Sequence, residues 1–248
     1  MDIVSFYTGE GAYKDFAEKL RASCVKFGIT PHIEQLQSTG VWARNNSRKP
    51  GFMQRKLLEL KRPIIWCDAD CEVCQFPVLL DNPPFDFAVY NWAADPKEDV
   101  PDQSVKRLKA TSGVVFFNYT PPALQLMYAW VKAAEKEPTI PDDTVLDMVF
   151  ERWRGVKIRH YWLPREYNRM DLRWPHVAPV INHVYRDGAI FTGAQTLERD
   201  PWLGRLPDTP LLVKPEALPG AQGSTGAQGR PGAQDRPGPQ GTPGPSPS

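Results

Sequence analysis

Strand-like and helix-like hydrophobic patterns alternate from residue 1 to about residue 210, and this alternation restricts the fold more than any other feature of the chain. The pattern opens with a β-rich run over residues 3–7, after which apolar residues recur at helical spacing at Phe16, Leu20, Cys24 and Phe27. Strands that alternate with helices predict an α/β fold with a mainly parallel sheet flanked by helices. In such sheets, ligands gather at the carboxyl ends of the strands.

The same alternation continues to residue 163. We expect further strands over residues 29–36, 63–66, 85–90, 113–118 and 156–163, and helices over residues 52–60 and 124–138. With 248 residues, of which 41% are hydrophobic and 24% are charged, the chain is long enough for one sizeable core. We therefore expect one globular domain over residues 1–210.

The last part of the chain has a different composition. From Gly220 onward, glycine opens eight of nine consecutive triplets, and Asp235 is the single exception. This period resembles collagen, in which only glycine fits the axis of the triple helix. We expect a Pro/Gly-rich, collagen-like tail over residues 211–248 that is disordered, because its polar composition cannot form a packed core. We expect a monomer, and trimerisation through this tail is the alternative.

Charge and apolar content exclude several classes of protein. Thirty Lys and Arg against twenty-nine Asp and Glu give a net charge of +1, which does not favour binding to nucleic acid or to a membrane surface. We expect neither a secretory signal at the N-terminus nor a membrane span, which needs roughly 18 apolar residues in a row. The crowded cysteines at positions 67, 71 and 74 do not resemble an extracellular disulfide framework. We therefore expect a cytoplasmic protein with reduced thiols, in the host cytoplasm if a phage encodes it.

A hydrophobic run at Ile64-Ile-Trp-Cys ends in two carboxylates, Asp68 and Asp70, with one residue between them. Hard cations such as Mn²⁺ and Mg²⁺ prefer oxygen ligands, so a turn of this kind at the end of a strand can aim both carboxylates at one ion. A solvated acidic turn is the alternative. The apolar strand before the turn favours the cation site, and the cation would neutralise a leaving diphosphate.

Five motifs, in this order along the chain, resemble those of GT-A nucleotide-diphospho-sugar transferases, the DxD glycosyltransferases. They are Lys49-Pro50-x-Phe52, Trp66-Cys-Asp68-Ala-Asp70, Ser112-Gly-Val-Val-Phe-Phe-Asn118, Asp142-Asp143-x-x-Leu146 and Leu163-Pro164-x-x-Tyr167-Asn168. The resemblance spans residues 2 to about 185. It implies a GT-A domain over residues 1–210, with a Rossmann-like mixed, mainly parallel sheet.

The resemblance implies a cation site made of three side chains. Asp68 and Asp70 would bind Mn²⁺ or Mg²⁺ beside the diphosphate of the donor, and we expect Asp70 to make the firmer contact. His183, in Ile181-Asn-His, resembles the late histidine that completes the metal site in many members of the family. The alternative is that His183 is an ordinary surface or core histidine.

The resemblance also implies a site for a nucleotide-sugar donor. Tyr7 and Thr8, at the end of the first strand, would lie against the base and ribose. Lys49 would reach the diphosphate, and a solvated lysine at the start of a helix is the alternative. Gly113 after Ser112 would let the backbone approach the sugar closely because glycine lacks a Cβ, unless the pair only forms a bulge. Frequency within the family favours a uridine nucleotide.

Asp142 is the candidate catalytic residue. It would lie near the donor sugar and the acceptor hydroxyl, where a carboxylate can orient the acceptor or serve as general base in an inverting reaction. The alternative is that Asp142 only caps a helix. Asp143 stands where the family usually has Gln.

Three cysteines in the same segment fit a different class of enzyme. Cys67-x-x-x-Cys71-x-x-Cys74 has the spacing with which radical SAM enzymes hold three irons of a four-iron cluster. Against this class, Val73 stands where an aromatic residue is usual, and about 200 structured residues do not suit eight β-α units. Zinc would need a fourth ligand at normal spacing. The remaining interpretation is that Cys67 packs and the other two are incidental.

We therefore expect a metal-dependent glycosyltransferase that moves a hexose or pentose from a nucleotide-diphosphate donor to a hydroxyl. The acceptor could be a polysaccharide, a lipid, a protein or a modified base in phage DNA. Arginines over residues 152–173 could contact a phosphate-bearing or nucleic-acid acceptor, which we do not favour. Some aromatic residues could stack on a sugar or base, although most should pack: Tyr161, Trp162, Trp174 and Tyr185. A catalytically silent module that kept the fold is a further alternative.

Overall fold

The computed structural model of the protein describes residues 1–95, 101–153, 155–171 and 173–184. Within these residues, the main sheet has six strands in the order β2-β1-β3-β6-β5-β7. The strands are β1 (Asp2–Thr8), β2 (Thr30–Leu36), β3 (Ile64–Cys67), β5 (Phe87–Asn91), β6 (Ala110–Phe117) and β7 (His160–Trp162). Neighbouring strands are parallel except where β6 runs antiparallel to β3 and β5. The prediction of a mainly parallel sheet is confirmed.

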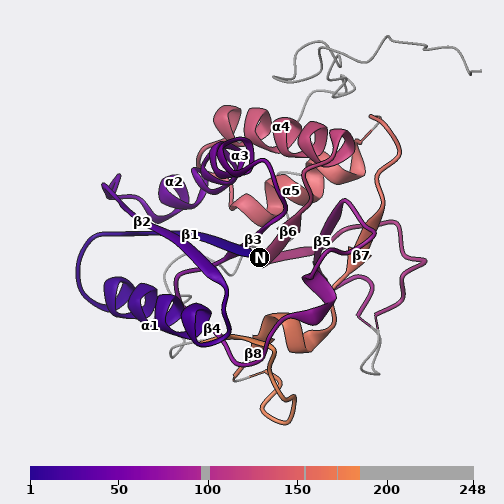
Figure 1. The fold of residues 1–248 in the computed structure, drawn as a ribbon. Helices are drawn as coiled ribbons and strands as arrows, with labels where there is room; N and C mark the ends of the chain where they lie inside the picture. The colour runs from indigo at the N-terminus through magenta and orange to yellow at the C-terminus, as the bar shows by residue number, and fades with distance from the viewer. Residues whose placement is uncertain (96–100, 154, 172, 185–248) are drawn as a thin grey trace, which may run out of the picture.

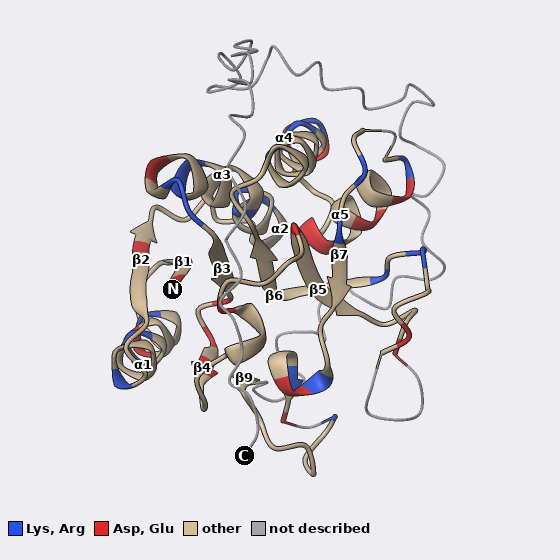
Figure 2. Ribbon diagram, turned by 45° about the vertical axis from the view of Figure 1, so that its right-hand side comes forward, with Lys and Arg blue, Asp and Glu red and all other residues tan. Residues whose placement is uncertain are grey.

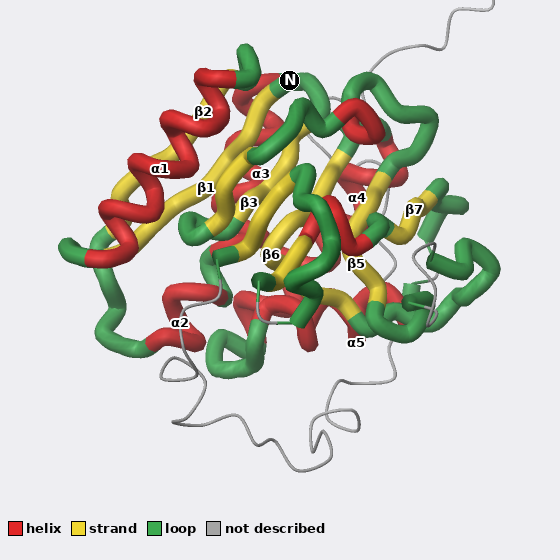
Figure 3. The backbone as a smooth tube through the Cα atoms, turned by 90° about the horizontal axis from the view of Figure 1, so that it is seen from below, coloured by secondary structure: helices red, strands yellow, loops and turns green. Residues whose placement is uncertain are grey.

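Helices cover both faces of this sheet (Figure 1). Three lie on one face and one on the other, namely α3 (Lys49–Leu60), α4 (Pro121–Lys136) and α5 (Asp142–Glu151) against α1 (Ala12–Lys26). Successive side chains of a strand point to opposite faces. Val4 and Phe6 of β1 therefore belong to the core under α3 and α4, whereas Ile3 belongs to the core under α1. Figure 3 shows α1 on one side of the six strands, with α3 and α4 behind them.

A second sheet of three short strands lies beside α1. Its order is β4-β9-β8, made of β4 (Cys71–Val73), β9 (Ile181–His183) and β8 (Arg169–Met170). β4 begins directly after the turn that follows β3, and it pairs antiparallel with β9 so that Cys71 lies opposite His183. This small sheet therefore brings the end of the described chain back to the Asp-x-Asp turn. Three short helical segments complete the described elements: α2 (Trp42–Asn46), η1 (Val78–Leu80) and η2 (Arg165–Asn168).

The structure departs from the sequence predictions mainly after residue 150. The strand predicted over residues 156–163 is shorter, since β7 covers only His160–Trp162, and Val156 is 42% exposed. β8 and β9 were not predicted, because strands of two or three residues are too short to show a period. The expected domain boundary near residue 210 and the collagen-like tail over residues 211–248 lie outside the described residues. Among the described helices, none combines the length and apolar character needed to cross a membrane.

Candidate active site

The turn after β3 fixes both carboxylates at the carboxyl end of the sheet. The backbone N–H of Asp68 donates to the carbonyl of Gly113 on β6 at 2.8 Å, and the N–H of Cys71 donates back to the carbonyl of Asp68 at 2.9 Å. The buried indole of Trp66 also donates from Nε1 to Asp68 Oδ1 at 2.7 Å. The two aspartates are therefore part of an ordered turn and not of a solvated loop. Figure 2 shows acidic residues after β3 and at the start of α5.

His183 lies against both carboxylates of the turn. Its Nε2 is 3.2 Å from Asp70 Oδ1 and 3.9 Å from Asp68 Oδ2. Burial opposes the charged imidazole, but Cys71 and the carboxylates of Asp70 and Asp68 outweigh burial and raise the pKa of His183 to about 10. Burial alone would raise the pKa of Asp70, yet His183 lowers it below the usual value. The three side chains expected to bind a cation thus converge, with an imidazolium between the carboxylates of the ligand-free protein. The Cys71 side chain also lies close to Asp70 and His183, and we call these three residues the histidine cluster.

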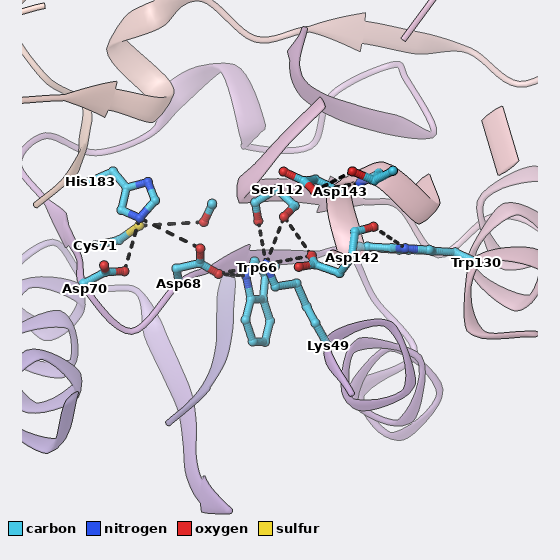
Figure 4. Close-up of polar contacts among 12 residues, drawn as sticks. Lys49, Trp66, Asp68, Asp70, Cys71, Ser112, Trp130, Asp142, Asp143 and His183 are labelled. Atoms are coloured by element: carbon cyan, nitrogen blue, oxygen red, sulfur yellow. Dashed lines mark hydrogen bonds and ion pairs between the residues drawn. The ribbon is translucent and has the colours of Figure 1, made fainter. Parts of the chain in front are cut away.

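Lys49, at the start of α3, is buried among polar groups (Figure 4). Its Nζ lies 3.0 Å from Asp68 Oδ1 and 2.9 Å from Asp142 Oδ2, and it donates to Ser112 Oγ at 3.0 Å. It also lies 5.2 Å from the centre of the Trp66 ring. Burial disfavours a charged lysine, but Asp142 and Asp68 raise the pKa of Lys49 well above its usual value. The solvated lysine considered from the sequence is therefore wrong. We call Lys49, Asp68, Ser112 and Asp142 the lysine network.

Asp142 points into this network from the first turn of α5. Its Oδ2 accepts a hydrogen bond from Ser112 Oγ at 2.7 Å, and its backbone carbonyl accepts one from Trp130 Nε1 at 3.0 Å. The residue before the helix is Pro141, and no side chain caps this helix terminus. The interpretation of Asp142 as a helix cap is therefore wrong. Its carboxylate holds Lys49 and Ser112 instead.

The Ser112-Gly113 pair lies in an irregular part of β6. Along β5, Val89 and Tyr90 are consecutive, but their partners on β6 are Val115 and Thr111. The bulge considered from the sequence is therefore present. A Cβ placed on Gly113 would lie 2.7 Å from His183 Nδ1, so glycine is needed here for the imidazole to fit. The sequence interpretation missed this reason, because the two residues are 70 positions apart.

A cleft of about 160 Å³ opens beside the turn. It is lined by six of the residues expected to bind donor or cation, which are Tyr7, Thr8, Lys49, Asp68, Asp70 and His183. Tyr13, Trp42 and Asn45 also line it, and the sequence interpretation missed them. Asn45 Nδ2 donates to Thr8 Oγ1 at 3.4 Å, which attaches α2 to the end of β1. Ser112, Gly113 and Asp142 are not among the lining residues, and they reach the cleft through Lys49 and His183.

Two further carboxyls of α5 have shifted pKa values. Burial and the neighbouring Asp142 raise the pKa of Asp143 to about 6. Burial raises the pKa of Asp147 to about 8, although its Oδ1 accepts a hydrogen bond from the N–H of Ala110. Asp143 stands at the position where the family pattern has Gln. Helix α5 therefore carries two carboxyls with raised pKa values, of which Asp143 is next to Asp142 of the lysine network.

The three cysteines do not form one group: Cys67 and Cys71 are hydrogen-bonded to each other, and Cys74 is not grouped with them. Cys71 donates from Sγ to the carbonyl of Gly113, whereas Cys74 donates to the carbonyl of Glu72. In the described ranges, the group of His, Cys, Asp and Glu side chains close enough to share an ion consists of Asp70, Cys71 and His183. The six-stranded sheet is also open and not a β-α barrel. The iron–sulfur interpretation is therefore wrong, and Cys71 lies beside Asp70 and His183.

Several arginines and aromatic residues of the second half contact other side chains of the protein. Arg165 pairs with Asp95 at 3.0 Å, and Arg173 stacks 4.2 Å from the centre of the Trp92 ring. Trp162 and Trp174 are buried. These contacts support packing for the described members of this group. Arg154 and Tyr185 lie outside the described residues.

Comparison with known proteins identifies the fold. No protein-family model matches the chain, and no curated protein sequence matches it either. Among solved structures, it is similar to a glycosyltransferase involved in the glycosylation of the major capsid of PBCV-1, with a TM-score of 0.56 and 18% identity over 73% of this chain and 92% of that chain. The galactosyltransferase LgtC in complex with donor and acceptor sugar analogues gives a TM-score of 0.46 and 14% identity, over 76% of this chain and 88% of that chain. The predicted α/β fold with a mainly parallel sheet is confirmed, and the first of these solved structures shares it.

Proposed function

We propose that the protein is a metal-dependent glycosyltransferase that moves a sugar from a nucleotide-diphosphate donor to a hydroxyl. One observation carries the proposal: Asp68, Asp70 and His183 converge at the carboxyl end of β3, on the cleft that Tyr7 and Thr8 also line. Ligands of open α/β sheets bind at this edge. The fold shared with a glycosyltransferase supports the reaction class.

The residues at this edge suit a divalent cation. Two carboxylates and an imidazole are ligands that Mn²⁺ accepts, and carboxylates also suit Mg²⁺. The ring of His183 lies so close to Gly113 that a Cβ there would collide with it, and this close fit supports a fixed position for the imidazole. Asp68, Asp70 and His183 would hold the ion. When bound, the ion would neutralise charge on the leaving diphosphate.

The other side chains would bind and orient the substrates. The cleft beside Tyr7 and Thr8 would hold the base and ribose. Lys49 ties Asp68 to Asp142, so the cation-binding carboxylate and the candidate catalytic carboxylate have a fixed separation. We propose that Lys49 places a fixed positive charge behind Asp68, and that Asp142, which is buried and does not line the cleft, acts on the substrates through Lys49. Such preorganised charges need no rearrangement during reaction.

The donor nucleotide and the compartment belong to the same proposal. A uridine nucleotide is favoured by frequency in the family that the motifs resemble. The described cysteines are free thiols, which supports a reducing compartment such as the cytoplasm. The acceptor would be a hydroxyl of a glycan, a lipid, a protein or a modified base.

The proposal is tested by ligand-dependent thermal stability. Ligands that bind only the native state raise the melting temperature. We expect one nucleoside diphosphate, tested from a panel with Mn²⁺, to raise the melting temperature only when Mn²⁺ is present. Asp70→Ala should abolish the shift, whereas the exposed control Asp81→Ala should keep it. If no nucleotide shifts the wild-type protein with Mn²⁺, the proposal is wrong.

A further inference from the structure

Asn168 is a buried amide without a hydrogen-bond partner. It is the last residue of η2, its side chain is 0% exposed, and within the described residues neither Oδ1 nor Nδ2 has a partner. Buried polar groups are almost always paired, because leaving them unpaired costs stability. The unpaired amide of Asn168 therefore indicates a hydrogen-bond partner that it contacts only when a ligand is bound.

The side chain of Asn168 points to the space beside Gly113 that His183 also occupies. A Cβ on Gly113 would lie 3.0 Å from Asn168 Oδ1 and 2.7 Å from His183 Nδ1. Both atoms therefore lie within 3.0 Å of the same point. The strands that carry them are neighbours as well, because Met170 of β8, which follows Asn168 closely, pairs with His183 of β9.

The carbonyl of Gly113 and the Nε2 atom of His183 already have other neighbours. The carbonyl of Gly113 accepts hydrogen bonds from the N–H of Asp68 at 2.8 Å and from Cys71 Sγ at 3.7 Å. Nε2 of His183 faces Asp70 and Asp68, so Nδ1 is the ring nitrogen on the side away from the carboxylates. A histidine that binds a metal through one nitrogen commonly donates its other N–H to an oxygen acceptor, which fixes the tautomer and the orientation of the ring.

We propose that Asn168 is a positioning residue for His183. Asn168 Oδ1 accepts the Nδ1–H of the neutral imidazole, directly or through one water molecule, and this bond directs the Nε2 lone pair toward a cation held by Asp70 and Asp68. Gly113 keeps the space between the two side chains open. The inference rests on the proposed function, because it assumes a cation at Asp68, Asp70 and His183.

The test is Mn²⁺ affinity, measured from the electron paramagnetic resonance signal of free Mn²⁺ during titration of the full chain. Asn168→Leu removes the acceptor at similar size, and we expect it to weaken Mn²⁺ binding by roughly 10- to 100-fold. Asn168→Asp keeps an acceptor at the same position and should restore binding to near the wild-type level. The melting temperature of metal-free Asn168→Leu should not fall, because the variant removes an unpaired buried amide. Thr120→Val, which loses a hydrogen bond to Asp86 at the opposite end of β6, is the matched control and should bind Mn²⁺ like the wild type.

A double-mutant cycle separates positioning from a general structural role. In a His183→Ala background, Asn168→Leu should have no further effect on Mn²⁺ affinity, since the residue acts only through the imidazole. If Asn168→Leu does not fold, Asn168→Ser takes its place with the same expected direction. Binding by the Leu or Ser variant within twofold of wild type, or an Asp variant as weak as the Leu variant, would overturn the inference alone. Absence of Mn²⁺ binding in the wild type would overturn both the proposed cation site and this inference.

Discussion

The lysine network and the histidine cluster share one turn but differ in how complete they are without ligand. In the lysine network, Lys49 contacts two carboxylates and a hydroxyl at 2.9–3.0 Å, so its ammonium has protein partners without any ligand. In the histidine cluster, Cys71, Asp70 and the neighbouring Asp68 favour the charged imidazole and raise the pKa of His183 to about 10. The lysine network therefore has its polar contacts in place without a ligand. In the histidine cluster, a proton on His183 occupies the place where a cation could bind.

The largest effect should come from removing the charge of the lysine network. Lys49→Met leaves the carboxylates of Asp68 and Asp142 without their buried partner, and breaking such a pair costs about 3–5 kcal/mol. We expect the free energy of unfolding, measured with urea, to fall by this amount. The exposed pair Lys132–Glu135 provides the control, because Lys132→Met should cost less than about 0.5 kcal/mol. A similar small loss for both variants would show that Lys49 is not part of the scaffold.

The histidine cluster, unlike the lysine network, should make the free energy of unfolding fall by a few kcal/mol as the pH rises. The pKa of His183 is about 10 in the folded protein against an ordinary value of 6.5. Its stabilisation is therefore fully present below about pH 6.5 and is lost as the pH rises toward 10. Asp147, with a pKa of about 8, also loses stability with rising pH, so the comparison must be made with His183→Ala. We expect the metal-free wild type to lose more stability than this variant between pH 6.5 and 10, and parallel curves would contradict the shift.

A smaller effect on stability should follow from filling the space beside the imidazole. Gly113→Ala places a methyl group 2.7 Å from His183 Nδ1, and overpacking of this kind costs about 1–3 kcal/mol. The ring must move, so Mn²⁺ affinity should fall together with the free energy of unfolding. Gly51, whose added Cβ would meet no atom within 4 Å, is the matched control. Unchanged Mn²⁺ affinity in Gly113→Ala would show that the position of the ring does not matter for the cation.

The smallest effect should come from Cys71, which belongs to the histidine cluster only by proximity. Burial raises the pKa of the Cys71 thiol well above its usual value, so the group stays protonated. Mn²⁺ also prefers oxygen ligands to thiolates. Cys71→Ser should therefore change Mn²⁺ affinity by less than about threefold, which isothermal titration calorimetry can measure. A larger loss would make Cys71 a ligand and the cluster a softer metal site.

The sequence predicted the parts of the site that depend on local pattern. Asp68 and Asp70 follow a strand whose apolar run is visible in one segment, and the order of motifs pointed to His183 and Asp142. Contacts made by folding were not visible: the burial of Lys49 between two carboxylates and the approach of His183 to Gly113 join residues far apart in the chain. The strands β8 and β9, which carry His183 to the turn, are too short to show a hydrophobic period. Trp42 and Asn45 lack any pattern that places a short helix beside the cleft.

The central claim is that Asp68, Asp70 and His183 hold a cation against the diphosphate of a nucleotide sugar. The most direct measurement is the relaxation of the two ³¹P nuclei of UDP-glucose or UDP-galactose in the presence of the protein and Mn²⁺. We expect the protein to enhance the paramagnetic relaxation of both phosphates, and Asp70→Ala to reduce it to the level of Mn²⁺ and nucleotide without protein. Relaxation that is the same with wild type, with Asp70→Ala and without protein would contradict the claim.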